Sequence, residues 1–83
     1  MAEENTQKTV TVYSTPTCMY CKMAKEFFDD KGVVYTELNV AEDENARNKM
    51  IERSGQMGVP VIVVGSEVTV GFDEGRLAAL LGL

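Results

Sequence analysis

The residues of this 83-residue chain best suited to chemistry are Cys18 and Cys21, which are its only cysteines and are separated by two residues. A thiolate is the nucleophile in disulfide exchange, and a second thiol nearby can displace a substrate held as a mixed disulfide. A disulfide that closes so short a loop adds little to stability, because the stabilisation grows with the length of the loop. The pair is therefore predicted to be reactive rather than structural.

Residue types that are missing or scarce exclude other chemistry. The chain has no histidine, which removes Ser-His and Cys-His nucleophile pairs and imidazole metal ligands. A closed zinc site needs four Cys or Cys with His, so metal binding at these cysteines would require a second chain. The net charge of −5 argues against nucleic-acid binding. The polar start and the lack of a long apolar run predict no membrane span, no signal peptide and a cytoplasmic protein.

The elements around the cysteines must position them. Residues 9–13 alternate and are rich in β-branched side chains, a pattern typical of a strand. Residues 14–17 predict a turn, and a helix is expected to begin at Cys18 or Met19 and to reach Lys31, with Gly32 as its stop. The apolar residues of this helix recur at helical spacing and predict a buried stripe. These residues are Tyr20, Met23, Ala24, Phe27 and Phe28.

The rest of the chain predicts further strands and helices in alternation. The strand over 59–64 is apolar throughout, as in a strand covered on both faces. The whole order is β-α-β-α-β-β-α, which predicts one α/β domain spanning residues 1–83, with a mixed sheet flanked by helices. Residues 1–8 are polar and are expected to fray. The remaining expected elements are strands over 33 to about 38 and 67–70, a hairpin turn at Gly65-Ser66, and helices over 43–54 and after Asp73, the last with Leu77, Leu80 and Leu81 on one face.

The start of the first helix predicts different roles for the two cysteines. Unpaired backbone N–H groups at a helix N-terminus stabilise an anion by about 0.3–2 kcal/mol, which favours Cys18 as a thiolate. Cys21 follows one helical turn later and faces inward, within reach of Cys18. We therefore predict that Cys18 attacks a substrate disulfide and that Cys21 resolves the mixed disulfide.

Two later segments are candidates for binding substrate. A cis Val59–Pro60 bond would leave the Val59 backbone free to pair with an extended substrate, whereas a trans bond would only begin a strand. Gly71 indicates a close backbone approach, and the helix opened by Asp73 has N–H groups for a carboxylate; the alternative is a loop Gly, a core Phe72 and an N-cap. An apolar rim around the thiol is a further reading of residues that could equally be core. These are Met19, Tyr20, Phe72 and Met57.

Residues 12–21, 58–60 and 71–73 together resemble the glutaredoxin family, and the resemblance extends over residues 9–82. It implies a thioredoxin fold with a four-stranded mixed sheet, a cis bond at Pro60, Cys18 as nucleophile and Cys21 as resolving cysteine. No tightly bound cofactor and no metal are expected for a single chain, and the resemblance makes glutathione a candidate co-substrate. The residues that would contact glutathione or another substrate are Tyr20, Val59, Pro60, Gly71, Phe72 and Asp73.

Departures from the family pattern bear on the electron donor. Glutathione-dependent members usually have Lys where this chain has Thr15, and Gly where it has Val70. Met19 replaces the usual Pro between the cysteines, and Gly58 replaces a usual Thr. The segment 69–72 is partly similar to that of NrdH-type redoxins, which are reduced by thioredoxin reductase. The departures therefore favour thioredoxin reductase over glutathione.

The combined prediction is a monomeric thiol–disulfide oxidoreductase that reduces protein or small-molecule disulfides, with thioredoxin reductase or glutathione as electron donor. Two alternatives from other classes stay open. One is an iron–sulfur or metal carrier in which two chains share the ion or cluster through Cys18. The other is a binding module that keeps the fold without turnover.

Overall fold

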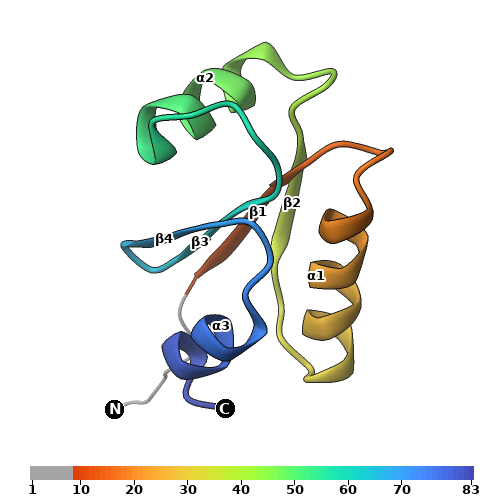
Figure 1. The fold of residues 1–83 in the computed structure, drawn as a ribbon, viewed down its shortest axis with the longest axis vertical. Coiled ribbons are helices and arrows are strands. Elements are labelled where there is room, and N and C mark those ends of the chain that lie inside the picture. The colour runs from red at the N-terminus through yellow and green to blue at the C-terminus, as the bar shows by residue number, and fades with distance from the viewer. Residues whose placement is uncertain (1–8) are drawn as a thin grey trace.

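Strands and helices alternate along the chain in the predicted order (Figure 1). The computed structural model describes residues 9–83, so the expected fraying of residues 1–8 lies outside the described part. Over residues 9–83, no helix is both long enough and apolar enough to cross a membrane. The elements are β1 (Val10–Ser14), α1 (Met19–Asp30), β2 (Thr36–Asn39), α2 (Glu44–Ser54), β3 (Val61–Val64), β4 (Glu67–Val70) and α3 (Glu74–Leu81).

The strands form the expected four-stranded mixed sheet, and their order in it is β2-β1-β3-β4. β1 and β2 are parallel, with Val12 opposite Glu37, because α1 carries the chain back to the same end of the sheet. β3 is antiparallel to both β1 and β4, and the turn between β3 and β4 contains Gly65 at a φ of 61°. The positive φ is the conformation that a tight hairpin turn requires.

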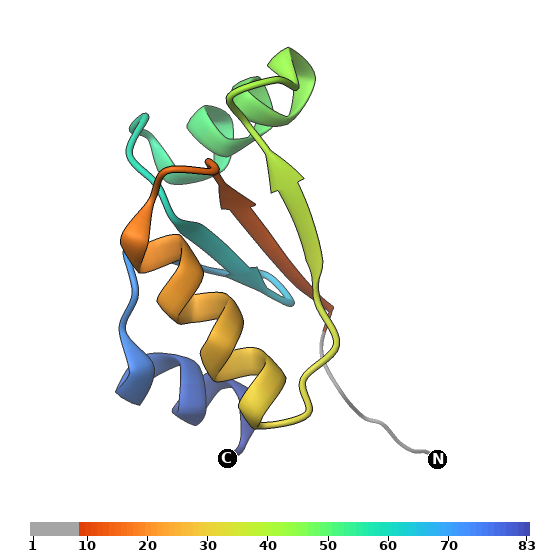
Figure 2. The same cartoon turned by 90° about the vertical axis from the view of Figure 1, so that its right-hand side faces the viewer.

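Helices cover both faces of the sheet (Figures 1 and 2). α1 and α3 pack on one face, where Phe28, Ile62 and Leu77 belong to one buried cluster. α2 packs on the other face, where Met50 and Val61 belong to a second cluster. All residues of β3 are buried, which confirms that this strand is covered on both sides.

The buried face of α1 differs from the predicted stripe. Tyr20 is 62% exposed and Met23 is 41% exposed, so the prediction that they are buried is wrong. Each residue turns the helix by about 100°, and the face that meets the sheet is centred on Cys21, Ala24 and Phe28, which leaves Tyr20 and Met23 on the flanks. The same rotation of the helix places Cys21 in the core, as predicted.

The end of α1 explains why β2 begins later than predicted. The N–H of Gly32 donates to the C=O of Asp29 and the N–H of Val33 donates to the C=O of Phe28, with Gly32 at a φ of 70°. This is a Schellman motif, and Val33 and Phe28 pack in the same cluster, as such motifs favour. Because Val33 completes the helix cap, pairing with β1 starts only at Thr36 and not at residue 33.

Other boundaries differ by one or two residues. β1 runs one residue later than predicted at each end, and α2 begins at Glu44, because Asp43 is its N-cap and accepts a hydrogen bond from the N–H of Ala46 at 3.0 Å. β3 begins at Val61 rather than at residue 59. Pro60 has no N–H to donate to a neighbouring strand, so regular pairing starts after it.

Candidate active site

Cys18 is the N-cap of α1 and holds its thiol at the first free amides of the helix. Its backbone is extended, at φ −85° and ψ 115°, and its Sγ accepts a hydrogen bond from the N–H of Cys21 at 3.1 Å. The preceding turn is closed by the N–H of Cys18, which donates to the C=O of Thr15 at 3.3 Å. Cys18 is half-buried, so its sulfur is accessible at the start of the helix.

Cys21 lies one turn further along α1 and is fully buried. Burial, followed by a hydrogen bond with the Cys18 side chain, raises the pKa of the Cys21 thiol to about 12. The backbone of Thr15 and the positive charge of Lys25 act in the opposite direction but are weaker than burial. Both cysteines are free thiols, so the structure is that of a reduced dithiol with one accessible sulfur and one buried, protonated sulfur.

We expect the reduced protein to lose stability as the pH rises. An unfolded cysteine ionises at about pH 8.5, whereas the pKa of folded Cys21 is raised to about 12. Its stabilisation is therefore fully present below the unfolded pKa and is lost between the two values, at up to about 1.4 kcal/mol per pH unit. Urea unfolding of the reduced protein at increasing pH measures the slope.

The Cys21→Ala variant is the matched control, because it keeps Lys25 and Tyr35, which also titrate in alkali. It should show a shallower loss of stability with pH than the wild-type chain. Equal slopes in the two proteins would contradict the assignment of this pH dependence to Cys21.

The segment before β3 presents an unpaired piece of backbone. The peptide bond between Val59 and Pro60 is cis, and Pro60 is buried. The C=O of Pro60 accepts a hydrogen bond from the N–H of Gly71 at 2.8 Å, which joins this segment to the end of β4. Within residues 9–83, neither the N–H nor the C=O of Val59 has a hydrogen-bond partner. Val59 therefore has both backbone groups available for an extended peptide.

The connection from β4 to α3 is held by its own side chains. Gly71 has a φ of 84° and nothing lies within 4 Å of a Cβ built there, so the left-handed backbone, and not a close approach within the chain, requires glycine. Phe72 packs edge-on against Phe27, with ring centroids 5.9 Å apart, which supports the core reading of Phe72 over the rim. Asp73 is the N-cap of α3, and its carboxylate accepts a hydrogen bond from the N–H of Arg76 at 3.1 Å.

The fold brings the three predicted segments to one end of the sheet. The start of α1, the segment before β3 and the connection from β4 to α3 lie beside one another in both orthogonal views (Figures 1 and 2). Large apolar side chains adjoin each segment and are exposed to solvent, in contrast to Phe72. These are Met19 at 74%, Tyr20 at 62%, Met57 at 69% and Val70 at 54%.

Sequence reasoning missed a polar link behind the cysteines. The Oγ of buried Ser14 donates to Oε2 of Glu37 at 2.8 Å, and Nζ of Lys25 lies 2.6 Å from the same oxygen. The Lys25 ammonium, with help from Ser14, holds the pKa of Glu37 below its usual value, and Glu37 in turn raises the pKa of Lys25. Lys25 stands four residues after Cys21, and that helical spacing was the available sign that it shares a face with the cysteine.

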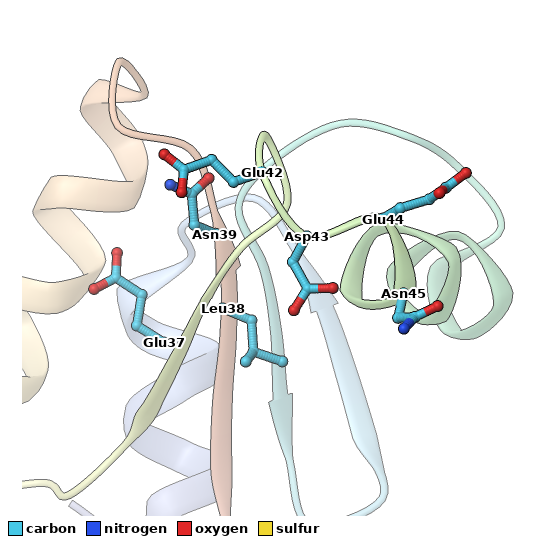
Figure 3. Close-up of a pocket in the computed structure, with 7 residues that line it drawn as sticks. All are labelled: Glu37, Leu38, Asn39, Glu42, Asp43, Glu44 and Asn45. Carbon is cyan, nitrogen blue, oxygen red and sulfur yellow. The ribbon is translucent and has the colours of Figure 1, made fainter.

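A hollow of about 560 Å³, which Glu37 also lines, lies where β2 connects to α2 (Figure 3). It is acidic, with Glu42, Asp43 and Glu44 among its lining residues, and it contains none of the predicted site residues. The Asp43 carboxylate is already committed to the cap of α2. Over residues 9–83 there is no cluster of three or more Cys, Asp or Glu side chains arranged to hold a metal ion.

Comparison with known proteins supplies the family context. A model of the Glutaredoxin family matches residues 10–69. Glutaredoxin 3 of Escherichia coli is 37% identical over 65 residues, which are 78% of this chain and 78% of that protein. The glutaredoxin-like protein NrdH of Lactococcus lactis is also 37% identical, over 71 residues that cover 86% of this chain and 97% of that protein. Identity alone therefore does not separate these two kinds of relative.

Solved structures agree with this similarity. The crystal structure of the thioredoxin-like protein BC3987 superposes with a TM-score of 0.83 at 34% sequence identity. The match covers 88% of this chain and the whole of that chain. The similarity in three dimensions therefore extends over nearly all of the described residues.

Proposed function

The chain belongs to the glutaredoxin family of thiol–disulfide oxidoreductases and has the thioredoxin fold of its relatives, and from this premise we propose that Cys18 and Cys21 are its redox dithiol. The observation that carries the proposal is the different environment of the two sulfurs. Cys18 is accessible, and its sulfur accepts a hydrogen bond from a backbone amide of the helix. Cys21 is buried, and the pKa of its thiol is raised to about 12. The first sulfur is suited to attack and the second to remain a thiol until it is needed.

The proposed exchange has two steps. The Cys18 thiolate attacks one sulfur of a substrate disulfide, which forms a Cys18 mixed disulfide and expels the other sulfur as a thiolate that takes a proton from water. Cys21 then loses its proton and attacks Cys18 Sγ, so that a Cys18–Cys21 disulfide forms and the second substrate thiolate leaves and is protonated. The substrate gains two electrons and the dithiol loses two, which the electron donor later restores.

The surroundings of the dithiol favour a protein disulfide as substrate. The unpaired N–H and C=O of Val59 can hydrogen-bond to an extended peptide, as an exposed strand edge does. The exposed side chains of Met19, Tyr20 and Met57 give an apolar surface on which a partner can bury side chains. Both features recognise a polypeptide in general rather than one small molecule.

We propose thioredoxin reductase as the electron donor. Position 15, in the turn before Cys18, is the polar but uncharged Thr15, so the cation usual in glutathione-dependent members is absent there. Val70, at the end of β4, places an exposed side chain where those members usually have glycine. Both differences weaken binding of a charged tripeptide, which favours a protein reductase as the donor.

The donor and the function can be tested in one experiment. The chain is assayed for NADPH-dependent reduction of a protein disulfide, with either thioredoxin reductase or glutathione plus glutathione reductase. We expect faster turnover with thioredoxin reductase. Preference for glutathione would overturn the donor assignment, and no turnover with either system would overturn the function itself.

A matched pair of variants tests the reason for the preference. Thr15→Lys restores the cation usual in glutathione-dependent members, whereas Thr17→Lys adds the same charge at an exposed position of the same turn. We expect the glutathione-dependent rate to increase with Thr15→Lys and not with Thr17→Lys. Equal rates in both variants would show that charge at position 15 does not determine the donor.

A further inference from the structure

We propose that Lys25, fixed by Glu37 and Ser14, is a positioning residue for the second step of the exchange: its ammonium stabilises the thiolate of Cys21 as that sulfur attacks the mixed disulfide. The inference rests on the proposed dithiol function. It assigns a role to a link between α1 and the sheet that neither the cysteine motif nor the substrate-binding segments use.

The geometry places a fixed positive charge beside a buried thiol. Lys25 follows Cys21 by one turn on α1, so their side chains are neighbours on the helix. Nζ of Lys25 lies 2.6 Å from Oε2 of Glu37, and the Oγ of Ser14, which is 1% exposed, donates to that oxygen at 2.8 Å. The Glu37 side chain extends from β2 toward α1, on the opposite side of the strand from Leu38 (Figure 3).

Glu37 keeps the ammonium near the cysteine. A lysine head group on a helix surface normally extends into water, because its long stem is flexible and its charge is strongly hydrated. Here the Lys25 side chain is only 28% exposed, since its charge is held between the helix and the sheet. The hydrogen bond to Glu37 also raises the pKa of Lys25, so the charge persists throughout the pH range of thiol exchange.

The charged groups around Cys21 change between the two steps. In the reduced protein burial, the hydrogen bond with Cys18 and the Cys18 charge raise the pKa of Cys21, while Lys25 lowers it. In the mixed disulfide the Cys18 sulfur carries no charge, so its repulsion ends and the attraction of Lys25 remains. Tyr35 is a further titratable group that acts on Lys25; burial, followed by the charge of Asp29, raises the pKa of Tyr35, which keeps it neutral.

This arrangement delays deprotonation of Cys21 until the first step is complete. Before Cys18 reacts, Cys21 stays a thiol; after Cys18 has bonded to substrate, Cys21 releases its proton to water with less opposition. The Cys21 thiolate then forms the Cys18–Cys21 bond, the bond from Cys18 to the substrate sulfur breaks, and the departing thiolate takes a proton from water. Lys25 remains protonated throughout and exchanges no atoms.

The two steps can be observed separately with an aromatic disulfide that releases a coloured thiolate. Mixing it with the reduced protein releases one equivalent when Cys18 attacks and a second when Cys21 resolves the mixed disulfide. We expect Lys25→Met to slow the second release about threefold near neutral pH. Loss of a neighbouring cation leaves about tenfold less thiolate, and the greater nucleophilicity of the more basic sulfur offsets part of that loss.

The pH profile separates this role from a structural one. In Lys25→Met the rate of the second release, plotted against pH, should shift to higher pH by about one unit, while the rate of the first release should not change. Lys25→Arg should restore most of the rate, and Glu37→Gln should slow the second release, because the lysine is no longer held. Lys31→Met, which removes the same charge at the far end of α1, is the matched control and should behave as the wild type.

Two results would overturn the inference. One is an unchanged rate and pH profile of the second release in Lys25→Met, and the other is equal slowing of both releases, which would indicate a general structural effect. Failure of the proposed function looks different, because the wild-type chain would then show no second release. Retained helical circular dichroism in Lys25→Met and Lys25→Arg establishes that the variants compared are folded.

Discussion

Replacement of Cys18 by serine is expected to abolish disulfide reduction while leaving the fold intact. A serine hydroxyl does not form a stable bond to a disulfide sulfur under the conditions in which a thiolate does, so the first step of the exchange is lost. The helix should remain stable, because serine is among the best N-cap residues. Its hydroxyl oxygen can accept the hydrogen bond that the N–H of Cys21 donates to Cys18 Sγ. Turnover with a small disulfide and the thermal unfolding midpoint are measured on the same sample.

The variant Cys21→Ser is the control for that experiment. It retains the attacking sulfur, so it should still form a mixed disulfide, which accumulates because the resolving thiol is absent. Mass spectrometry of the trapped adduct identifies Cys18 as the attachment site. Turnover by Cys18→Ser at the rate of the wild-type chain would refute the role of Cys18.

Truncation of Phe28 to alanine is expected to destabilise the protein by about 3–5 kcal/mol. Phe28 is fully buried, and its ring packs at centroid distances of 5.6 Å from Phe27 and 5.5 Å from Tyr35. It also supports the cap that ends α1 through its contact with Val33. Domains of this size have only about 5–15 kcal/mol of stability in total, so the variant is expected to be partly unfolded at ambient temperature.

Urea unfolding monitored by circular dichroism measures this loss. Met19→Ala is the matched control, because Met19 is on the same helix and 74% exposed, and its truncation should change the free energy of unfolding by less than about 0.5 kcal/mol. Similar midpoints for Phe28→Ala and the wild type would show that the cluster under α1 contributes far less than its burial indicates.

Local features of the sequence were enough to predict most of the fold. Alternation, helical spacing and stop residues located every element, and the boundaries that moved did so for identifiable reasons. Val33 has the apolar, β-branched character of a strand residue, yet its N–H completes the cap of α1, so β2 starts at Thr36. Whether the N–H of Val33 caps the helix or pairs with a strand depends on where the helix ends, and strand propensity does not show this.

The candidate site was less completely predictable. Cys18 at the helix start, Asp73 as an N-cap and the segment around Pro60 follow from short motifs and from the family resemblance. Finding these motifs in the sequence does not show which of the residues beside them are buried. Tyr20 fits the helical stripe as well as Phe27 does, and only the packing of α1 on the sheet leaves Tyr20 in solvent.

The amino-acid sequence by itself determined which atoms can react, two sulfurs one turn apart at the start of a helix, because that arrangement is set by local backbone geometry. The tertiary structure decided how differently they behave. Burial of Cys21 comes from packing of α1 against the sheet, and the charge beside it is held by contacts between residues 12 and 23 positions apart in the chain. Helical position predicted that Cys21 faces inward, but the extent of its burial and the charge beside it depend on how the elements pack.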